Sequence, residues 1–272
     1  MNLGIRGHDV LKNDLVCDLK EKSLNHLQLV LKKVLKKEEL ENLDSMIENY
    51  ALNLKKNNIK VSMLGAYFNP IQNDLKKLEN DIKWFKKNID LCDVFNTTFV
   101  GSETGSYNND KWTYNPLNHT KEAFNEVKKV FTDLAIYAKE KNKAILIEGA
   151  YNHVIYNPSL LKKLITEIGL DNVFVIIDIY NYLYLGNYKN AKDLFDESLE
   201  LFKDQIKIFH IKDFTLENDG LKQVPIGQGL MPYPYMIKRI KEVCPNATLI
   251  FEGVTGEDIT TSTKYIKKLM GE

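Results

Sequence analysis

Eight short apolar segments recur along the chain, and each is followed by a stretch with helical character. The apolar segments are residues 3–7, 26–31, 60–66, 94–100, 144–148, 173–178, 206–211 and 248–252. Several are apolar at consecutive positions, as expected for strands of a parallel sheet that is covered on both faces. Between them, residues 38–57, 73–89, 120–142 and 261–270 repeat apolar side chains at steps of three and four, which is typical of amphipathic helices.

The number and spacing of these units favour a closed barrel. Strand starts fall about every 30 to 40 residues, as whole strand–helix units require, and no Pro/Ser/Gly-rich linker divides the chain. A length of 272 residues suits a barrel of this type, which typically has about 250 residues. We therefore predict an α/β fold with one domain, residues 1–272, that forms a single (β/α)8 TIM barrel.

An open, doubly wound sheet is the alternative fold. It would normally carry a glycine-rich phosphate-binding turn directly after its first strand. The segment "GIRGHD" after the first apolar run is a poor match to that motif, and "IGQG" at 226–229 lies too late in the chain. The barrel is therefore the better prediction.

Composition narrows the classes of partner. Lys plus Arg and Asp plus Glu both number 37, so there is no net positive charge to attract a polyphosphate, and nucleic acid is not expected to bind. Cys17, Cys92 and Cys244 form no CxxC motif and are expected to be reduced. No apolar run reaches about 18 residues, so we expect no membrane contact and a cytoplasmic location.

The last four predicted strands each end in a side chain that can bind a metal. Glu148, Asp178, His210 and Glu252 stand where the apolar runs stop, one strand–helix unit apart. In a closed barrel these strand ends are neighbours on the rim that carries the active site. Asp178 alone would also fit a helix N-cap, since Asp favours that position. Three converging carboxylates would repel one another, however, and a divalent cation removes that cost.

The type of ligand indicates the type of metal. Three carboxylates and one imidazole favour a hard divalent ion over a thiolate-type zinc site. We expect one divalent metal ion held by Glu148, Asp178, His210 and Glu252, with manganese as the first choice and magnesium, cobalt or zinc as alternatives.

Other polar residues near the strand ends are candidate substrate ligands. Arg6 and His8 follow the first strand, and Arg6 suits a substrate oxyanion or phosphate as well as an ion pair that closes the barrel mouth. The loop "GSETGSY" offers Glu103 or Ser102 to the hydroxyls of a substrate, with a plain turn as the alternative. His153 lies in the loop after Glu148 and is a further candidate.

Lys212 lies two residues beyond His210 and therefore points to the same side of the strand. It suits a negatively charged substrate oxygen or a phosphate, with a salt bridge to a rim carboxylate such as Asp213 as the alternative. Four aromatic residues in early loops fit an apolar wall against a substrate, but we expect packing to be their more common role: Tyr67, Phe68, Tyr107 and Trp112.

The order Glu, Asp, His, Glu on successive late strands resembles the sugar isomerase/epimerase branch of the xylose isomerase-like TIM barrels, over essentially the whole chain. Tagatose-type 3-epimerases, hydroxypyruvate isomerase-like proteins and inosose dehydratases belong to the same superfamily. The resemblance implies that Glu148 and Glu252 both bind the metal and transfer the proton. It also draws attention to Asn181, three residues after Asp178, where many relatives place a substrate-binding histidine.

The resemblance implies a function and two alternatives to it. The first expectation is a divalent-metal-dependent sugar isomerase or ketose epimerase that transfers a proton through a metal-stabilised enediolate, acting on a sugar or sugar phosphate. Endonuclease IV, which cuts abasic DNA, is a related branch, but it uses a histidine where this chain has Asn181. A non-catalytic barrel that binds a metal or a sugar is the other alternative. Self-association into a homo-oligomer stays open.

Overall fold

A closed barrel of parallel strands forms the centre of the protein. In the computed structural model, which describes residues 1–218 and 220–272, eight strands follow one another around the barrel in the order β1-β10-β7-β6-β5-β4-β3-β2. They are β1 (Asn2–Arg6), β2 (His26–Leu29), β3 (Lys60–Gly65), β4 (Phe99–Glu103), β5 (Ala144–Glu148), β6 (Val173–Ile177), β7 (Ile206–Ile211) and β10 (Thr248–Phe251). The predicted (β/α)8 fold is confirmed, and the open-sheet alternative is wrong.

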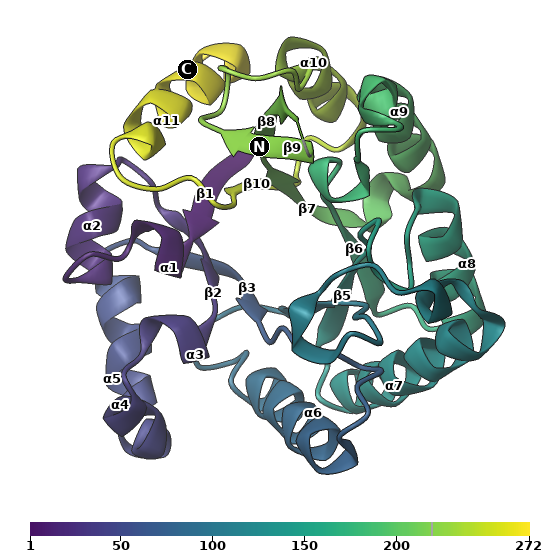
Figure 1. Cartoon of the computed structure of the whole chain (residues 1–272). Coiled ribbons are helices and arrows are strands. Elements are labelled where there is room, and N and C mark those ends of the chain that lie inside the picture. Colours follow the sequence, from purple (N-terminus) through teal and green to yellow (C-terminus); the bar gives the residue numbers. More distant parts are fainter. Residues whose placement is uncertain (219) are drawn as a thin grey trace.

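The helices form a ring outside the strands (Figure 1). They are α1 (Gly7–Val10), α2 (Leu15–Glu21), α3 (Leu31–Val34), α4 (Lys37–Glu41), α5 (Leu43–Lys56), α6 (Leu75–Asp90), α7 (Lys121–Glu140), α8 (Pro158–Ile168), α9 (Ala191–Phe202), α10 (Tyr233–Val243) and α11 (Asp258–Met270). Several begin at the side chains that favour N-caps: Asp74 accepts from the Lys77 N–H, and Thr120 from the Ala123 N–H. The four predicted helices lie in α4–α5, α6, α7 and α11.

Apolar side chains fill the barrel in a layer below its mouth. This interior cluster contains one residue from each of five strands: Met63, Leu146, Ile176, Ile208 and Ile250. Because successive side chains of a strand alternate between its two faces, the residue two positions later also points inward. Those next positions on the last four strands are Glu148, Asp178, His210 and Glu252. The fold therefore places a polar layer directly above an apolar one.

Gly101 leaves room for this apolar layer. A Cβ at that position would lie 2.4 Å from the Met63 Cε and 3.1 Å from the Ile176 Cδ1. Since barrel interiors alternate large and small residues to reach close packing, a glycine on β4 accommodates the long methionine that comes from β3.

The strand predicted at residues 94–100 is wrong in position. Val94 and Phe95 belong to the turn that follows α6, in which the Phe95 N–H donates to the Leu91 carbonyl, and the Phe95 ring packs edge-on against Tyr50. Val94 and Phe95 are apolar because they pack against neighbouring side chains, and they do not pair with another strand. The strand begins at Phe99 instead, so Glu103 becomes the last residue of β4.

An antiparallel hairpin, β8 (Asp213–Glu217) and β9 (Gly220–Val224), follows β7 and was not predicted. Its Gln223 amide donates to the Glu252 carbonyl at 2.5 Å, so the hairpin contacts the barrel rim. Within the described residues, no helix is long and apolar enough to cross a membrane.

Candidate metal centre

The four predicted ligands converge at the mouth of the barrel. Glu148, Asp178, His210 and Glu252 each offer one ligand atom, and these four atoms all lie within 4.8 Å of one another. The His210 Nδ1 lies 3.0 Å from the Glu148 Oε1 and 2.9 Å from the Glu252 Oε2. Glu148 and Asp178 are 1% exposed, so this is a buried polar cluster rather than a set of solvated surface groups.

A glutamine fixes the orientation of the His210 ring. The His210 Nε2 lies 2.6 Å from the Gln28 Oε1, and the Gln28 amide nitrogen donates to the Tyr67 hydroxyl at 2.9 Å. The Gln28 oxygen therefore accepts, so Nε2 must carry the proton. In the neutral imidazole the lone pair then sits on Nδ1, which faces the carboxylates. An outer partner of this kind typically sets the tautomer of a metal-binding histidine.

The charges in the cluster perturb one another strongly. Burial alone would lower the pKa of His210, but the neighbouring charges of Glu148 and Glu252 raise it to about 10. Burial opposes ionisation of Glu252, yet Lys212, His210 and Arg6 hold the pKa of Glu252 well below its usual range. The carboxylates therefore gather positive charge around them, which is the environment that a divalent cation would supply.

Asp178 carries an oxygen with spare bonding capacity. Its Oδ1 accepts the Asn181 N–H at 3.1 Å, whereas the buried Oδ2 accepts no well-aligned hydrogen bond from the described residues. The Lys212 Nζ lies 2.9 Å from this Oδ2 as an ion-pair partner. Burial raises the pKa of Asp178 to about 6, although Lys212 opposes the shift. A buried carboxylate oxygen that accepts no well-aligned hydrogen bond is suited to bind a cation.

Lys212 enters the same cluster. Its Nζ lies 2.8 Å from the Glu252 Oε1, and it donates to the Asn181 Oδ1 at 2.9 Å. Burial would lower the pKa of Lys212, but the carboxylates of Asp178 and Glu252 raise it, so the side chain stays charged. The alternative role, a salt bridge to a rim carboxylate, is therefore present, but its partners are Asp178 and Glu252. Asp213 was the wrong partner, because its carboxylate accepts the backbone N–H groups of residues 214, 227, 229 and 231.

Arg6 and His8 lie on the β1 side of the cluster. The Arg6 guanidinium donates to the Glu252 Oε1 at 2.7 Å and to the Asp9 Oδ2 at 2.8 Å, which is the ion-pair role weighed above. The buried His8 Nδ1 has no hydrogen-bond partner among the described residues. The ability of Arg6 and His8 to bind substrate stays a prediction.

Three further candidates lie on the β4–β6 side. The Asn181 amide donates to the Glu148 Oε1 at 2.9 Å and lies 3.5 Å from the Glu103 Oε1. Burial, then the charges of Glu148 and Glu252, raise the pKa of Glu103 well above its usual range. Burial, and to a lesser extent the charge of Lys212, lowers the pKa of His153 to about 3, so the His153 ring is neutral. Neutral groups of this kind suit hydroxyl recognition.

Sequence reasoning missed Gln28 altogether, and it left the role of the loop aromatics open. Tyr67, Phe68 and Trp112 all line a hollow at the barrel mouth, and Phe68 also packs against Phe85 at 5.7 Å between ring centroids. The Ser102 hydroxyl accepts the Phe68 N–H at 3.1 Å, so this serine holds a loop.

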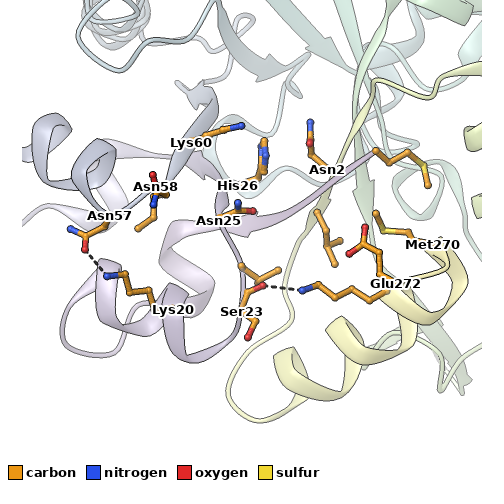
Figure 2. A pocket seen from close by; sticks show the side chains of 15 residues that line it. Asn2, Lys20, Ser23, Asn25, His26, Asn57, Asn58, Lys60, Met270 and Glu272 are labelled. Atoms are coloured by element: carbon orange, nitrogen blue, oxygen red, sulfur yellow. Dashed lines mark hydrogen bonds between the residues drawn. The ribbon is translucent and has the colours of Figure 1, made fainter.

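The opposite end of the barrel has a separate polar hollow of about 570 Å³ (Figure 2). It lies at the strand starts, beside His26, and at the C-terminal ends of α2, α5 and α11. Lys20 donates to the Asn57 Oδ1 at 2.6 Å, and Lys267 donates to the Ser23 carbonyl at 3.3 Å. Lysines at this end compensate the negative ends of the helix dipoles, so the hollow has a structural explanation.

Most of the chain is similar to a known family of barrels. Residues 25–269 match the family model described as xylose isomerase-like TIM barrel. The chain belongs to this family. Among proteins with a curated description, none matches the sequence.

Several solved structures superpose over nearly the entire chain. A D-tagatose 3-epimerase-like protein is 14% identical with a TM-score of 0.79, covering 100% of this chain and 97% of its own. D-psicose 3-epimerase, crystallised in the presence of D-fructose, is 13% identical with a TM-score of 0.71 and covers 100% and 97%. The IolI protein, crystallised with a zinc atom, is 19% identical with a TM-score of 0.72 and covers 99% and 96%. At these identities the likeness establishes the fold.

Proposed function

We propose that this protein is a divalent-metal-dependent sugar isomerase or ketose epimerase. The observation that carries the proposal is the buried cluster of four ligand atoms within 4.8 Å, with the His210 Nδ1 turned inward by Gln28. Family membership and the sugar epimerases among the structural neighbours support the same substrate class.

The metal ligands we propose are Glu148, Asp178, His210 and Glu252. Three carboxylates and one imidazole suit manganese, with magnesium, cobalt or zinc as alternatives. When bound, a divalent cation polarises a sugar carbonyl and draws the neighbouring hydroxyl into a defined orientation. The remaining steps belong to the side chains of the protein.

The proton transfer is assigned to the two glutamates. Glu148 lies on β5 and Glu252 follows β10, with β6 and β7 between them in the barrel. They therefore approach a bound sugar from two directions. One carboxylate takes the proton from the carbon next to the carbonyl and leaves an enediolate. The other carboxyl group gives a proton back, to the opposite face of the same carbon for epimerisation or to the adjacent carbon for isomerisation.

Charged and polar neighbours stabilise and orient the substrate. Lys212 stays charged and can donate an N–H to the oxygen that gains negative charge in the enediolate. Arg6, His8, Glu103, His153 and Asn181 surround the centre and are assigned to the hydroxyls or to a phosphate of the sugar. The buried His153 Nδ1 has no hydrogen-bond partner among the described residues.

The DNA-cutting alternative finds less support. That chemistry typically needs two or three metal ions about 3.5–4 Å apart and a basic surface. One candidate metal-binding group was found among the described residues, and the chain has no net charge. We therefore propose a small-molecule sugar or sugar phosphate as the partner.

The direct test is a turnover screen on metal-stripped and reloaded protein. Free and phosphorylated ketoses and aldoses are incubated in D₂O, and product and deuterium content are followed by NMR. We expect turnover of at least one sugar, with deuterium at the carbon next to the carbonyl, only after a divalent cation is added. Turnover that survives complete metal removal would contradict the proposal, as would no exchange in any sugar with any of the four cations.

A further inference from the structure

The mouth of the barrel holds two hollows that share Glu103 and Trp112 in their walls. The first lobe, about 460 Å³, is lined by Arg6, His8 and Glu252 and by exposed lysines. The second lobe, about 550 Å³, lies over the β5 and β6 loops and is lined by Tyr151, His153, Tyr180, Asn181, Tyr184 and Leu221. Each has the size of a typical small-ligand pocket, about 300–1,000 Å³.

The second lobe differs from the first in chemistry. No lysine or arginine lies among the described residues of its wall. Tyr151 and Tyr184 stack with ring centroids 4.1 Å apart, and the Trp112 and His153 rings lie 5.1 Å apart. His153 is 3% exposed, and its Nδ1 has no hydrogen-bond partner among the described residues. Aromatic faces together with the neutral Asn181 amide in the same wall suit an uncharged ring with apolar C–H faces and hydroxyls at its edge.

The wall between the two lobes is held in a costly backbone conformation. Trp112 has a φ of +49°, in the left-handed region that bulky residues rarely adopt. Such strain persists where surrounding structure enforces it and is frequent at ligand-binding positions. The conformation places the indole beside both lobes, which supports a role in contacting the ligand.

The second lobe lies beside the metal centre, because two residues of its wall contact residues of the cluster. Asn181 lines the lobe, donates to the Glu148 Oε1 at 2.9 Å and accepts from Lys212 at 2.9 Å. Tyr180 also lines it, with the Lys212 Nζ 5.7 Å from its ring centroid. A group in the second lobe is therefore close enough to be a covalent part of a sugar that reacts at the centre.

We propose, building on the function above, that the substrate is a glycosylated sugar with two rings. The reacting ketose or aldose lies over the metal centre, and a neutral glycosyl ring bonded to one of its hydroxyls lies in the second lobe between Trp112 and Tyr184. A charged phosphate does not suit this lobe, because no cationic side chain lies in its described wall.

The test compares one-ring and two-ring substrates on the metal-loaded enzyme. Fructose is set against turanose, maltulose and palatinose, which carry a glucosyl group on O3, O4 and O6 of fructose, and against 4-O-benzyl fructose and fructose 6-phosphate. We expect kcat/KM for deuterium exchange to rise at least tenfold with one of the glucosyl sugars. An equal rise with the benzyl sugar, or a larger one with the phosphate, would overturn the glycosyl assignment.

Variants locate the second ring. Tyr184→Ala should cut the two-ring over one-ring preference about three- to tenfold, because it removes one aromatic face. Tyr137→Ala is the matched control: this tyrosine on α7 binds Asp90 on the outer surface at 3.0 Å and should leave the ratio unchanged. Quenching of Trp112 fluorescence by the disaccharide, absent in Trp112→Phe, gives a binding readout independent of turnover.

Failure of this inference differs from failure of the proposed function. Deuterium exchange into fructose, with no higher kcat/KM for any two-ring sugar, would overturn the two-ring substrate and leave the isomerase assignment standing. A two-ring preference that Tyr184→Ala does not reduce would overturn the second lobe as its site. No exchange in any sugar would overturn both.

Discussion

Replacement of Gln28 by leucine should weaken metal binding although the residue does not belong to the ligand set. Gln28 is fully buried, and its Oε1 accepts from the His210 Nε2 at 2.6 Å. The Gln28→Leu variant leaves this N–H buried without a partner, which costs about 1–3 kcal/mol. It also removes the acceptor that keeps the Nδ1 lone pair directed at the other ligands.

The expected loss of affinity follows from these magnitudes. A cost of about 1–3 kcal/mol that is felt in the metal-bound state corresponds to a fall of about 5- to 150-fold, and outer partners of metal-binding histidines typically contribute about 10–100-fold. Isothermal titration of metal-free protein with Mn²⁺ and Co²⁺ measures it. Gln28→Glu keeps an acceptor for the His210 N–H, so it should retain most of the affinity that Gln28→Leu loses.

Two controls separate orientation from general damage. Gln72→Leu removes another buried glutamine, whose amide donates to the Asp81 Oδ2 at 3.0 Å, and should leave metal affinity unchanged. Tyr67→Phe removes the hydroxyl that accepts from Gln28 and reports on that second hydrogen bond. Wild-type affinity in Gln28→Leu, with affinity lost in His210→Ala, would refute the argument that Gln28 sets the tautomer.

Three further predictions concern the pH dependence of metal binding, the loss of one ligand, and the binding of DNA. Mn²⁺ affinity should fall as the pH drops from about 8 to 5, because Glu148 and Glu252 raise the pKa of His210 to about 10 and this ring must release a proton to bind the cation. The fall should steepen below about pH 6, because burial raises the pKa of Asp178 to about 6 and a second proton then competes with the cation. Titrations at about pH 5 to 8 check this, and a flat profile contradicts it. Asp178→Ala should abolish metal binding yet keep the wild-type far-UV circular dichroism spectrum, since Asp178 lies above the apolar layer. Unfolding of this variant would place the residue among the structural core. An abasic DNA duplex should be neither bound nor nicked at physiological salt in the presence of metal, because the chain has no net positive charge. Gel-shift and nicking assays measure this. A cut duplex would favour the DNA-cutting class of enzyme over the sugar isomerase class.

The ligand positions were predictable from the sequence because the barrel obeys a strict alternation. Leu146 fills the interior and Glu148 follows two residues later; Ile208 and His210 repeat the relation. An apolar strand that ends in one ionisable residue is visible in a single sequence, and recurrence on four strands indicates convergence. The roles of these residues in metal binding and proton transfer remain predictions.

The partners of the ligands could not be found in the same way. Gln28 carries no charge and lies at a strand end like many structural amides, so its contact with His210 depends on the closure of β2 beside β1. The pairing of Lys212 with Asp178 and Glu252 depends on side-chain conformation, and sequence proximity favoured Asp213 instead. Val94 and Phe95 read as strand residues because burial in a turn and burial in a sheet select the same apolar side chains.

The most direct test of the central claim is deuterium exchange by the Glu148→Gln and Glu252→Gln variants at saturating metal. An amide still offers an oxygen to the cation but cannot take up a proton. If the two glutamates transfer the proton, neither variant makes product at any metal concentration. The variant that lacks the substrate-side base incorporates no deuterium, whereas in an epimerase the other variant still exchanges the substrate proton. Recovery of near wild-type turnover by both variants at high metal would contradict the account and shift the proton transfer to His153 and Lys212.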